Sequence, residues 1–250
     1  MVSILSYARQ QTSAEAATPV TCERRFFTGL AVAMALVCFA GFAPSYYMKA
    51  RFHAGPELSQ LLHLHGAAFT AWIALLITQT SLVAAGKVRW HRRLGVAGGV
   101  LAVLMMVLGA AVAIVRARQG VLGQASGAPP LVFLAIPFAT LVVFPLLIGA
   151  ALYFRKRADT HKRLMMLGTT EIVTAAVARL PGMAGNPLLF FAATDLFVLA
   201  LAINDFVTRG RVHRATLWGG LVLIASQPLR LMISGTPEWL AFARWLIGTP

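Results

Sequence analysis

Residues 62–85 contain no aspartate, glutamate, lysine or arginine. A helix of about 24 residues, rising 1.5 Å per residue, is about 36 Å long and is therefore long enough to cross the hydrocarbon core of a bilayer. Similar apolar stretches recur along the chain, and short basic turns separate them. This pattern predicts an all-α fold, a polytopic transmembrane helix bundle.

The composition agrees with a membrane protein. Mean hydropathy is +0.75, and 58% of the residues are hydrophobic while 12% are charged, whereas a soluble domain carries about 25% charged residues. The formal net charge is +14, but the basic residues cluster between apolar stretches, where membrane topology and anionic headgroups explain them. We therefore expect membrane lipid as a partner and no nucleic acid.

The chain divides into three parts. Residues 1–25 are expected to form a polar N-terminal tail, 26–233 the transmembrane domain, and 234–250 a C-terminal segment lying along the membrane interface, since it is too short to cross again. Seven spans are expected, at residues 26–48, 62–85, 93–115, 129–154, 161–180, 187–207 and 213–233.

Two local features predict how these helices pack and bend. Gly95 and Gly99 are four residues apart, a spacing that lets two helix backbones approach closely. Pro137 and Pro145 each remove a backbone donor, so a bend is expected in the fourth span.

The basic residues predict the orientation. Fifteen of the 22 lysines and arginines fall on the side of the N-terminus when the seven spans alternate, and the positive-inside rule then places the N-terminus in the cytoplasm. The fifteen are Arg9, Arg24, Arg25, Lys87, Arg89, Arg92, Arg93, Arg155, Lys156, Arg157, Lys162, Arg163, Arg209, Arg211 and Arg214.

Ionisable groups inside the spans mark the candidate site, because burying them costs about 2.5–3.5 kcal/mol on insertion scales. Glu171 lies about 15 Å into the fifth span, close to the middle of the membrane, and Asp195 lies in the outer half of the sixth. We expect a polar pocket in the outer half of the bundle that binds or moves a small molecule or protons. The candidate pocket residues are His65, Trp72, Glu171, Arg179, Asp195, Gln227 and Arg230.

Two histidines open the second span. His65 shares a seven-residue stripe with Trp72 and Gln79, so His65 is expected to face protein while His63 faces the interface or the loop. Residues two apart on a helix point about 200° away from each other, so His63 and His65 do not fit one metal ion. No metal site is expected.

The two buried carboxyl groups are expected in opposite states. Asp195 has Arg179 and Arg230 at similar depth, which predicts a charged, paired aspartate. Glu171 has no such neighbour on its own helix, which predicts a protonated side chain bonded to a threonine. A purely structural alternative is that Asp195 pairs with Arg230 or Arg179 and that this ion pair only ties helices together.

A histidine and basic residues recur at the start of three spans, at His91, His161 and His213. Interfacial histidines near lipid phosphates explain this pattern, and the alternative is a b-type haem or a quinone bound on the cytoplasmic side. The turn HRRLG and the later HKRLM helix that ends in AVARLPG resemble bacterial polytopic membrane families of unknown function, over residues 63–181. The resemblance implies a multi-pass protein of a bacterial inner membrane, and it implies no catalytic residue. A structural or assembly subunit without a site is the third alternative.

Overall fold

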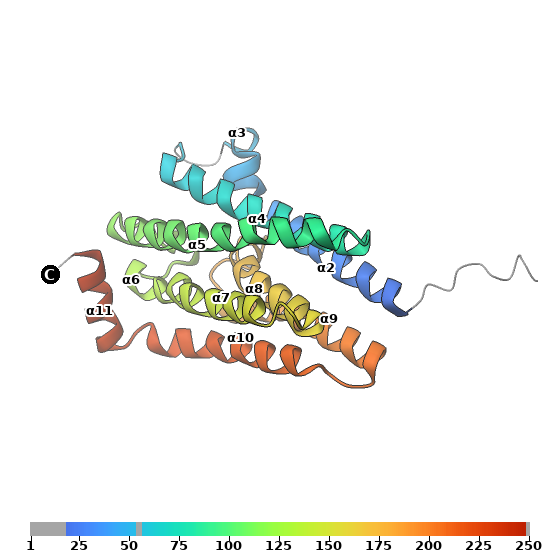
Figure 1. Ribbon diagram of the computed structural model, residues 1–250. Helices are drawn as coiled ribbons and strands as arrows, with labels where there is room; N and C mark the ends of the chain where they lie inside the picture. The colour runs from blue at the N-terminus through green and yellow to red at the C-terminus, as the bar shows by residue number, and fades with distance from the viewer. Residues whose placement is uncertain (1–18, 54–56, 249–250) are drawn as a thin grey trace, which may run out of the picture.

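The computed structural model describes residues 19–53 and 57–248 of the chain, and this described part is helical, without strands (Figure 1). The all-α expectation is confirmed. The helices, with a π-helical turn at Ala43–Tyr47 and a 3-10 turn at Gln124–Ser126, are α2 (Pro19–Phe42), α3 (Lys49–Phe52), α4 (Gln60–Ala84), α5 (Val88–Arg118), α6 (Pro130–Phe133), α7 (Ala135–Tyr153), α8 (Ala158–Val177), α9 (Pro187–Arg209), α10 (Arg214–Ile233) and α11 (Pro237–Ile247).

Six helical segments of the described residues are long and apolar enough to cross a membrane, and they indicate a multi-pass membrane protein. They are Glu23–Tyr47, Gln60–Ala84, Val88–Arg118, Pro130–Tyr153, Pro187–Arg209 and Arg214–Ile233. The expected fifth span corresponds to α8, which is not among them because it carries charged and hydroxyl side chains. The count of seven spans stays a prediction.

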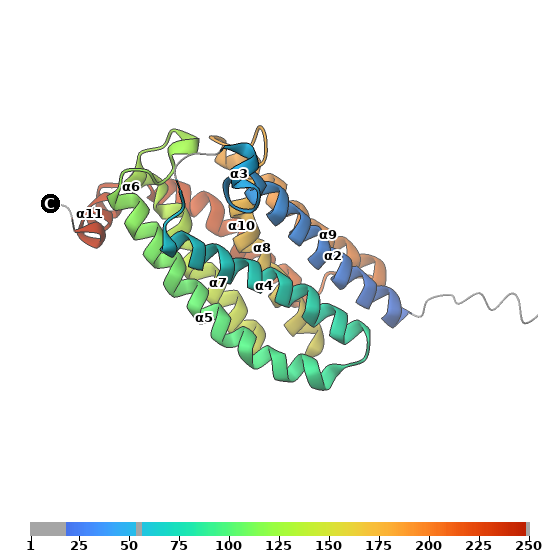
Figure 2. The same ribbon diagram turned by 90° about the horizontal axis from the view of Figure 1, so that it is seen from above.

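Helix α8 lies at the centre of the bundle (Figure 2). It packs against α2, α7, α9 and α10, and every residue from 166 to 174 is buried. Glycines bring these helices together: Gly168 lies beneath Ile148 of α7, and Gly219 of α10 lies against Leu167. A helix surrounded by other helices needs no apolar outer face, which explains how α8 accommodates its polar residues.

Several boundaries differ from those expected. α2 begins at Pro19, so residues 19–25 are helical instead of belonging to the tail, and the expected tail at 1–18 lies outside the described residues. The fourth span is interrupted at Leu134, between α6 and α7, while Pro145 lies inside α7. The break comes just before Pro137, whose missing N–H cannot continue the helical hydrogen-bond ladder.

The expected close contact through both Gly95 and Gly99 is wrong. No heavy atom lies within 4 Å of a β-carbon built on Gly99, and the nearest neighbour of one built on Gly95 is the Gln79 amide at 3.6 Å. The tight position is Gly98, where a β-carbon would lie 3.0 Å from Leu75 of α4. The contact with α4 therefore runs along the side of α5 that carries Gly95 and Gly98, and Gly99 lies outside it.

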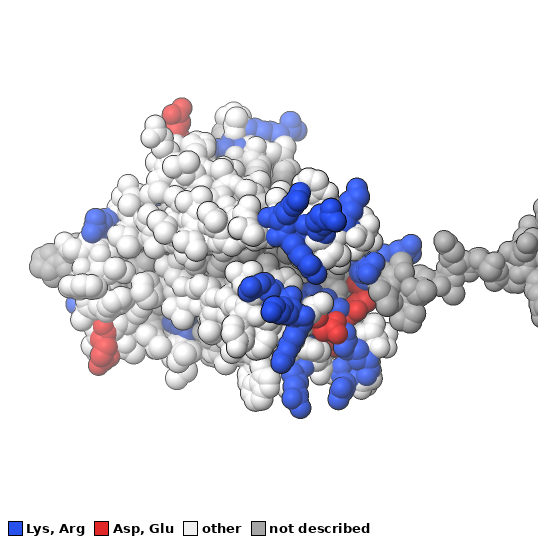
Figure 3. Space-filling view, viewed as in Figure 1, with Lys and Arg blue, Asp and Glu red and all other residues white. Residues whose placement is uncertain are grey.

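Lysines and arginines gather at one end of the bundle (Figure 3). We call this the basic end; it includes residues 85–93, 154–158 and 209–214, which are the connections α4–α5, α7–α8 and α9–α10 with the adjoining helix ends. At the opposite end α11 lies across the bundle (Figure 1), where Trp239 donates a hydrogen bond to the Leu131 carbonyl at 2.8 Å and its ring contacts Phe138. α11 lies within the expected C-terminal segment 234–250, and its place at the membrane interface stays a prediction.

Candidate functional site

A buried ion pair joins α8 to α10 in the interior of the bundle. Arg230 Nη1 lies 3.0 Å from Glu171 Oε1, and Nη2 lies 3.3 Å from Oε2, so the guanidinium and the carboxylate form two parallel hydrogen bonds. Both side chains are almost fully buried. Paired bonds of this kind are the strong form of an arginine–carboxylate contact.

Neighbouring groups complete this arrangement, which we call the Glu171 cluster and which comprises Glu171, Arg230, Thr140 and Ser226. The Thr140 hydroxyl of α7 donates to Glu171 Oε1 at 2.8 Å. Arg230 donates from Nη2 to the Ser226 hydroxyl at 2.5 Å and from Nε to the Ser226 carbonyl at 3.2 Å. Its guanidinium also lies 5.3 Å from the ring centroid of Phe191. Three helices therefore position one ion pair.

Asp195 on α9 has a different partner from the one expected. It is half-buried and accepts a hydrogen bond from the Gln227 amide at 2.7 Å. No lysine or arginine nitrogen of the described residues lies within 4.0 Å of its carboxylate. Asp195 is close enough to Glu171 for the two carboxylates to repel each other. The expectation that Asp195 holds Arg230 and that Glu171 is the unpaired, protonated carboxyl group is wrong.

Of the expected inward stripe on α4, Trp72 contacts α8, and His65 is half-buried. Trp72 is buried, and its indole N–H donates to the Thr169 hydroxyl of α8 at 3.2 Å. The His65 ring lies beside that of Phe69 on the same helix, with centroids 4.3 Å apart and planes inclined by 34°, while His63 is exposed. His65 Nδ1 is buried and has no hydrogen-bond partner within the described part of the chain.

Arg179 follows α8 and lies apart from the Glu171 cluster. It donates to the Ala175 carbonyl at 2.5 Å, and its guanidinium lies 4.5 Å from the ring centroid of Phe42. The seven expected pocket residues therefore separate into the pair Glu171–Arg230, the adjacent pair Asp195–Gln227, and three residues with partners of their own. Two grooves, of about 860 and 310 Å³, open on the described surface, and neither is lined by any of the seven.

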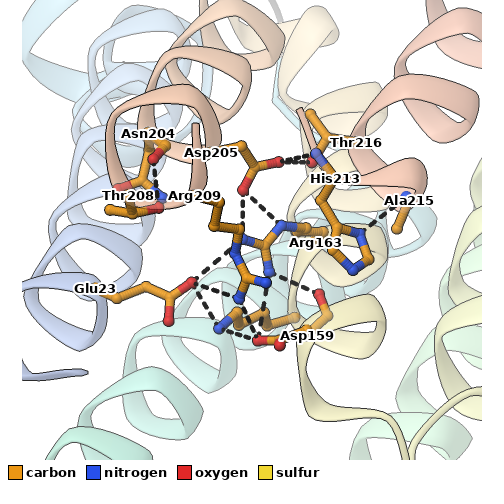
Figure 4. Close-up of polar contacts among 11 residues, drawn as sticks. Glu23, Asp159, Arg163, Asn204, Asp205, Thr208, Arg209, His213, Ala215 and Thr216 are labelled. Atoms are coloured by element: carbon orange, nitrogen blue, oxygen red, sulfur yellow. Dashed lines mark hydrogen bonds and ion pairs between the residues drawn. The ribbon is translucent and has the colours of Figure 1, made fainter. Parts of the chain in front are cut away.

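A second buried network lies at the basic end and was missed in the sequence (Figure 4). Its centre is Arg163 of α8, which is completely buried and bonds to Asp205 of α9 through Nε, at 2.7 Å, and through Nη2. Nη1 donates to the Asp159 carbonyl at 2.9 Å, and Nη2 also donates to Glu23 of α2 at 3.2 Å. All three nitrogens of this guanidinium therefore donate to acceptors.

The network continues around Arg163. Asp205 accepts on its other oxygen from the Thr216 hydroxyl at 2.6 Å and from the His213 backbone N–H at 3.1 Å, which ties in α10. At the rim, Glu23 and Asp159 pair with Lys162 and Arg209. We call the whole set the Arg163 cluster: Glu23, Asp159, Lys162, Arg163, Asp205, Arg209, His213 and Thr216. The chain has eight acidic residues, and three of them lie among the arginines of this end.

Two of the three expected haem or interfacial histidines come together. The rings of His91 on α5 and His161 on α8 have centroids 6.2 Å apart, and His161 Nδ1 lies 2.8 Å from the Ala151 carbonyl. His213 instead caps α10, since its Nδ1 accepts from the Ala215 N–H at 3.0 Å. Burial holds the pKa of His213 below its ordinary value, and the Arg163 guanidinium lowers it further. A neutral imidazole is the form that accepts this bond.

Comparison of the chain with protein-family models, with curated proteins and with solved structures finds no match.

Proposed function

We propose that the protein is a seven-span protein of a bacterial inner membrane, with its N-terminus in the cytoplasm, and that it moves protons through the outer half of its bundle. The 20 residues of α8 rise about 30 Å, enough to cross the hydrocarbon core. Its central, buried position supports α8 as the crossing that composition alone does not identify. The lysines and arginines of the basic end support the orientation.

The observation that carries the proton proposal is that Arg230 forms an ion pair with Glu171 and not with Asp195. Glu171 accepts from both terminal nitrogens of Arg230, Nη1 and Nη2, whereas Asp195 has the neutral amide of Gln227. A carboxylate without a cation in a low-dielectric setting gains most from binding a proton. We therefore assign proton binding to Asp195, and assign to the Glu171–Arg230 pair the role of a fixed dipole beside it.

Proteoliposomes that contain a pH-sensitive dye test this proposal. A potassium gradient with valinomycin sets a membrane potential, and we expect the wild-type protein to change the internal pH faster than liposomes without protein. Asp195→Asn is expected to lose this excess rate. Glu238→Gln, which makes the same chemical change at an exposed position on α11, is the control and should keep the rate. An excess rate that survives in Asp195→Asn, or none in the wild type, contradicts the proposal.

A second candidate is a redox protein with a b-type haem or a quinone, and the adjacent rings of His91 and His161 favour it. His91 Nδ1 is buried and has no hydrogen-bond partner in the described part of the chain, so it is available to a ligand. Protein from haem-replete cells that shows a Soret band, lost in His91→Ala, supports haem, and solvent extraction tests for quinone. A protein that neither moves protons nor carries either cofactor is left with a structural or assembly role.

A further inference from the structure

A groove of about 860 Å³ opens at the basic end between α7 and α10. Its sides are apolar, with Leu146 and Phe154 from α7 and its end, and Trp218 and Val222 from α10. Its depth comes from Gly219, which has no side chain and lies directly over Leu167 and Leu164 of α8. Leu146 and Trp218 are more than half exposed, so the groove opens toward the side of the bundle.

The end of this groove is strongly basic. Arg157, Arg209, Arg211 and Arg214 all line it. Arg209 is held by the carboxylates of the Arg163 cluster, but no carboxylate within residues 19–53 and 57–248 lies within 4.0 Å of the other three guanidinium groups. These three arginines are exposed. They form a concentration of positive charge directly next to an apolar channel.

An apolar channel that ends in guanidinium groups matches one kind of molecule, an acyl chain with an anionic head. Guanidinium groups bind phosphate oxygens through paired hydrogen bonds, and basic pockets between helices at a membrane surface favour anionic lipid headgroups. A free phosphate would leave the apolar walls unused, and a zwitterionic lipid would bring a cation to the arginines. Exposed Tyr153 and Trp218 place the end of the groove at the level of the headgroups.

We infer that this groove is a binding site for an anionic phospholipid. The phosphate contacts Arg157, Arg211 and Arg214, and one acyl chain lies along Leu146 and Trp218 between α7 and α10. The site is separate from the Glu171 cluster and does not depend on proton movement. It makes α7 and α10, which both pack on α8, sensitive to the lipid composition of the membrane.

Lipid titrations of the purified protein in mild detergent test this inference, with the midpoint of thermal unfolding as readout. We expect phosphatidylglycerol to raise the midpoint in a saturable way, while phosphatidylcholine and glycerol 3-phosphate do not. The double variant Arg211→Gln/Arg214→Gln should bind phosphatidylglycerol about 10- to 30-fold more weakly, since each arginine near a headgroup contributes about a factor of five. Both positions are exposed, so the variant should fold.

The matched control removes two exposed arginines from another part of the basic end. Arg89→Gln/Arg92→Gln makes the same change in net charge on α5, outside the groove, and is expected to keep the wild-type affinity. If the two double variants lost the same affinity for phosphatidylglycerol, the overall charge would explain the loss, and this result would overturn the site. An equal response to phosphatidylcholine, or a response to glycerol 3-phosphate alone, would overturn the assignment of the ligand.

Discussion

The Arg163 cluster and the Glu171 cluster are both built around residues of α8, but they differ in how many hydrogen-bond partners their charged groups have. Arg163 meets acceptors from α2, α8 and α9, and its main partner Asp205 receives further bonds from α10. In the Glu171 cluster one arginine meets one carboxylate, while the nearby Asp195 has only an amide. In the Arg163 cluster both oxygens of the buried Asp205 carboxylate accept hydrogen bonds, so this carboxylate has little to gain from a proton.

The difference distinguishes charged groups that fix the positions of helices from a carboxylate that can change its protonation. A fully bonded network in a low-dielectric interior fixes the relative position of the helices that contribute to it, and breaking it leaves a buried charge uncompensated. A carboxylate held only by an amide changes its protonation at a much lower cost. This contrast supports the proposal that the Arg163 cluster stabilises the bundle while Asp195, beside the Glu171 cluster, binds the proton. Both are accommodated because α8 is surrounded by protein.

The largest effect is expected at Arg163. Arg163→Met should lower the free energy of unfolding by about 3–5 kcal/mol, because Asp205 then remains buried without a cation. Chemical denaturation in detergent measures it. Lys162→Met, one residue away and partly exposed, is the control and should cost less than about 1 kcal/mol. Similar losses for the two variants would show that the network is no more than a set of surface pairs.

The next effect separates the two carboxylates of the outer half. Glu171→Gln leaves Arg230 buried with one neutral amide, and we expect a loss of about 3 kcal/mol. Asp195→Asn keeps an oxygen that accepts from Gln227, so the expected loss is under about 1 kcal/mol. Thermal unfolding of both variants decides between them. A loss for Asp195→Asn as large as that for Glu171→Gln would mean that Asp195 is also part of an ion pair.

A smaller effect is expected from the contact between α4 and α8. Trp72→Phe keeps most of the ring but removes the N–H that donates to Thr169, which should cost about 1 kcal/mol. Trp245→Phe on α11 is the control, because Trp245 is 73% exposed and should change the stability little. An unchanged free energy of unfolding in Trp72→Phe would show that this hydrogen bond does not help to hold α4 against α8.

The sequence predicts the apolar helices well because their length and their lack of charge are local properties. The stripe of His65 and Trp72 is also local, since the period of the helix alone decides which residues share a face. Helix ends were less accurate at Pro19, where polar residues continue the helix beyond the apolar stretch. The polar α8 is not apolar enough to be identified as a span from its composition, so its crossing of the membrane stays a prediction.

The pairing of the charges was not predictable in this way. Depth along a helix places Asp195 and Glu171 at similar distances from Arg230, but the choice between them depends on which helices are neighbours and how each is rotated. α10 turns Arg230 toward α8 and Gln227 toward α9. Arg163 was counted only among the basic residues of the cytoplasmic side for the same reason, because nothing in its local sequence indicates that Asp205, 42 residues later, lies beside it.

The central claim is that α8 crosses the membrane inside the bundle, and cysteine labelling tests it directly. In a chain with Cys22 and Cys38 changed to serine, Lys156→Cys and Ala184→Cys introduce exposed thiols on either side of α8. An impermeant maleimide should label Ala184→Cys in intact cells and Lys156→Cys only after permeabilisation. Labelling of both positions from the same side would contradict the claim, and the reverse pattern would keep the crossing but invert the orientation.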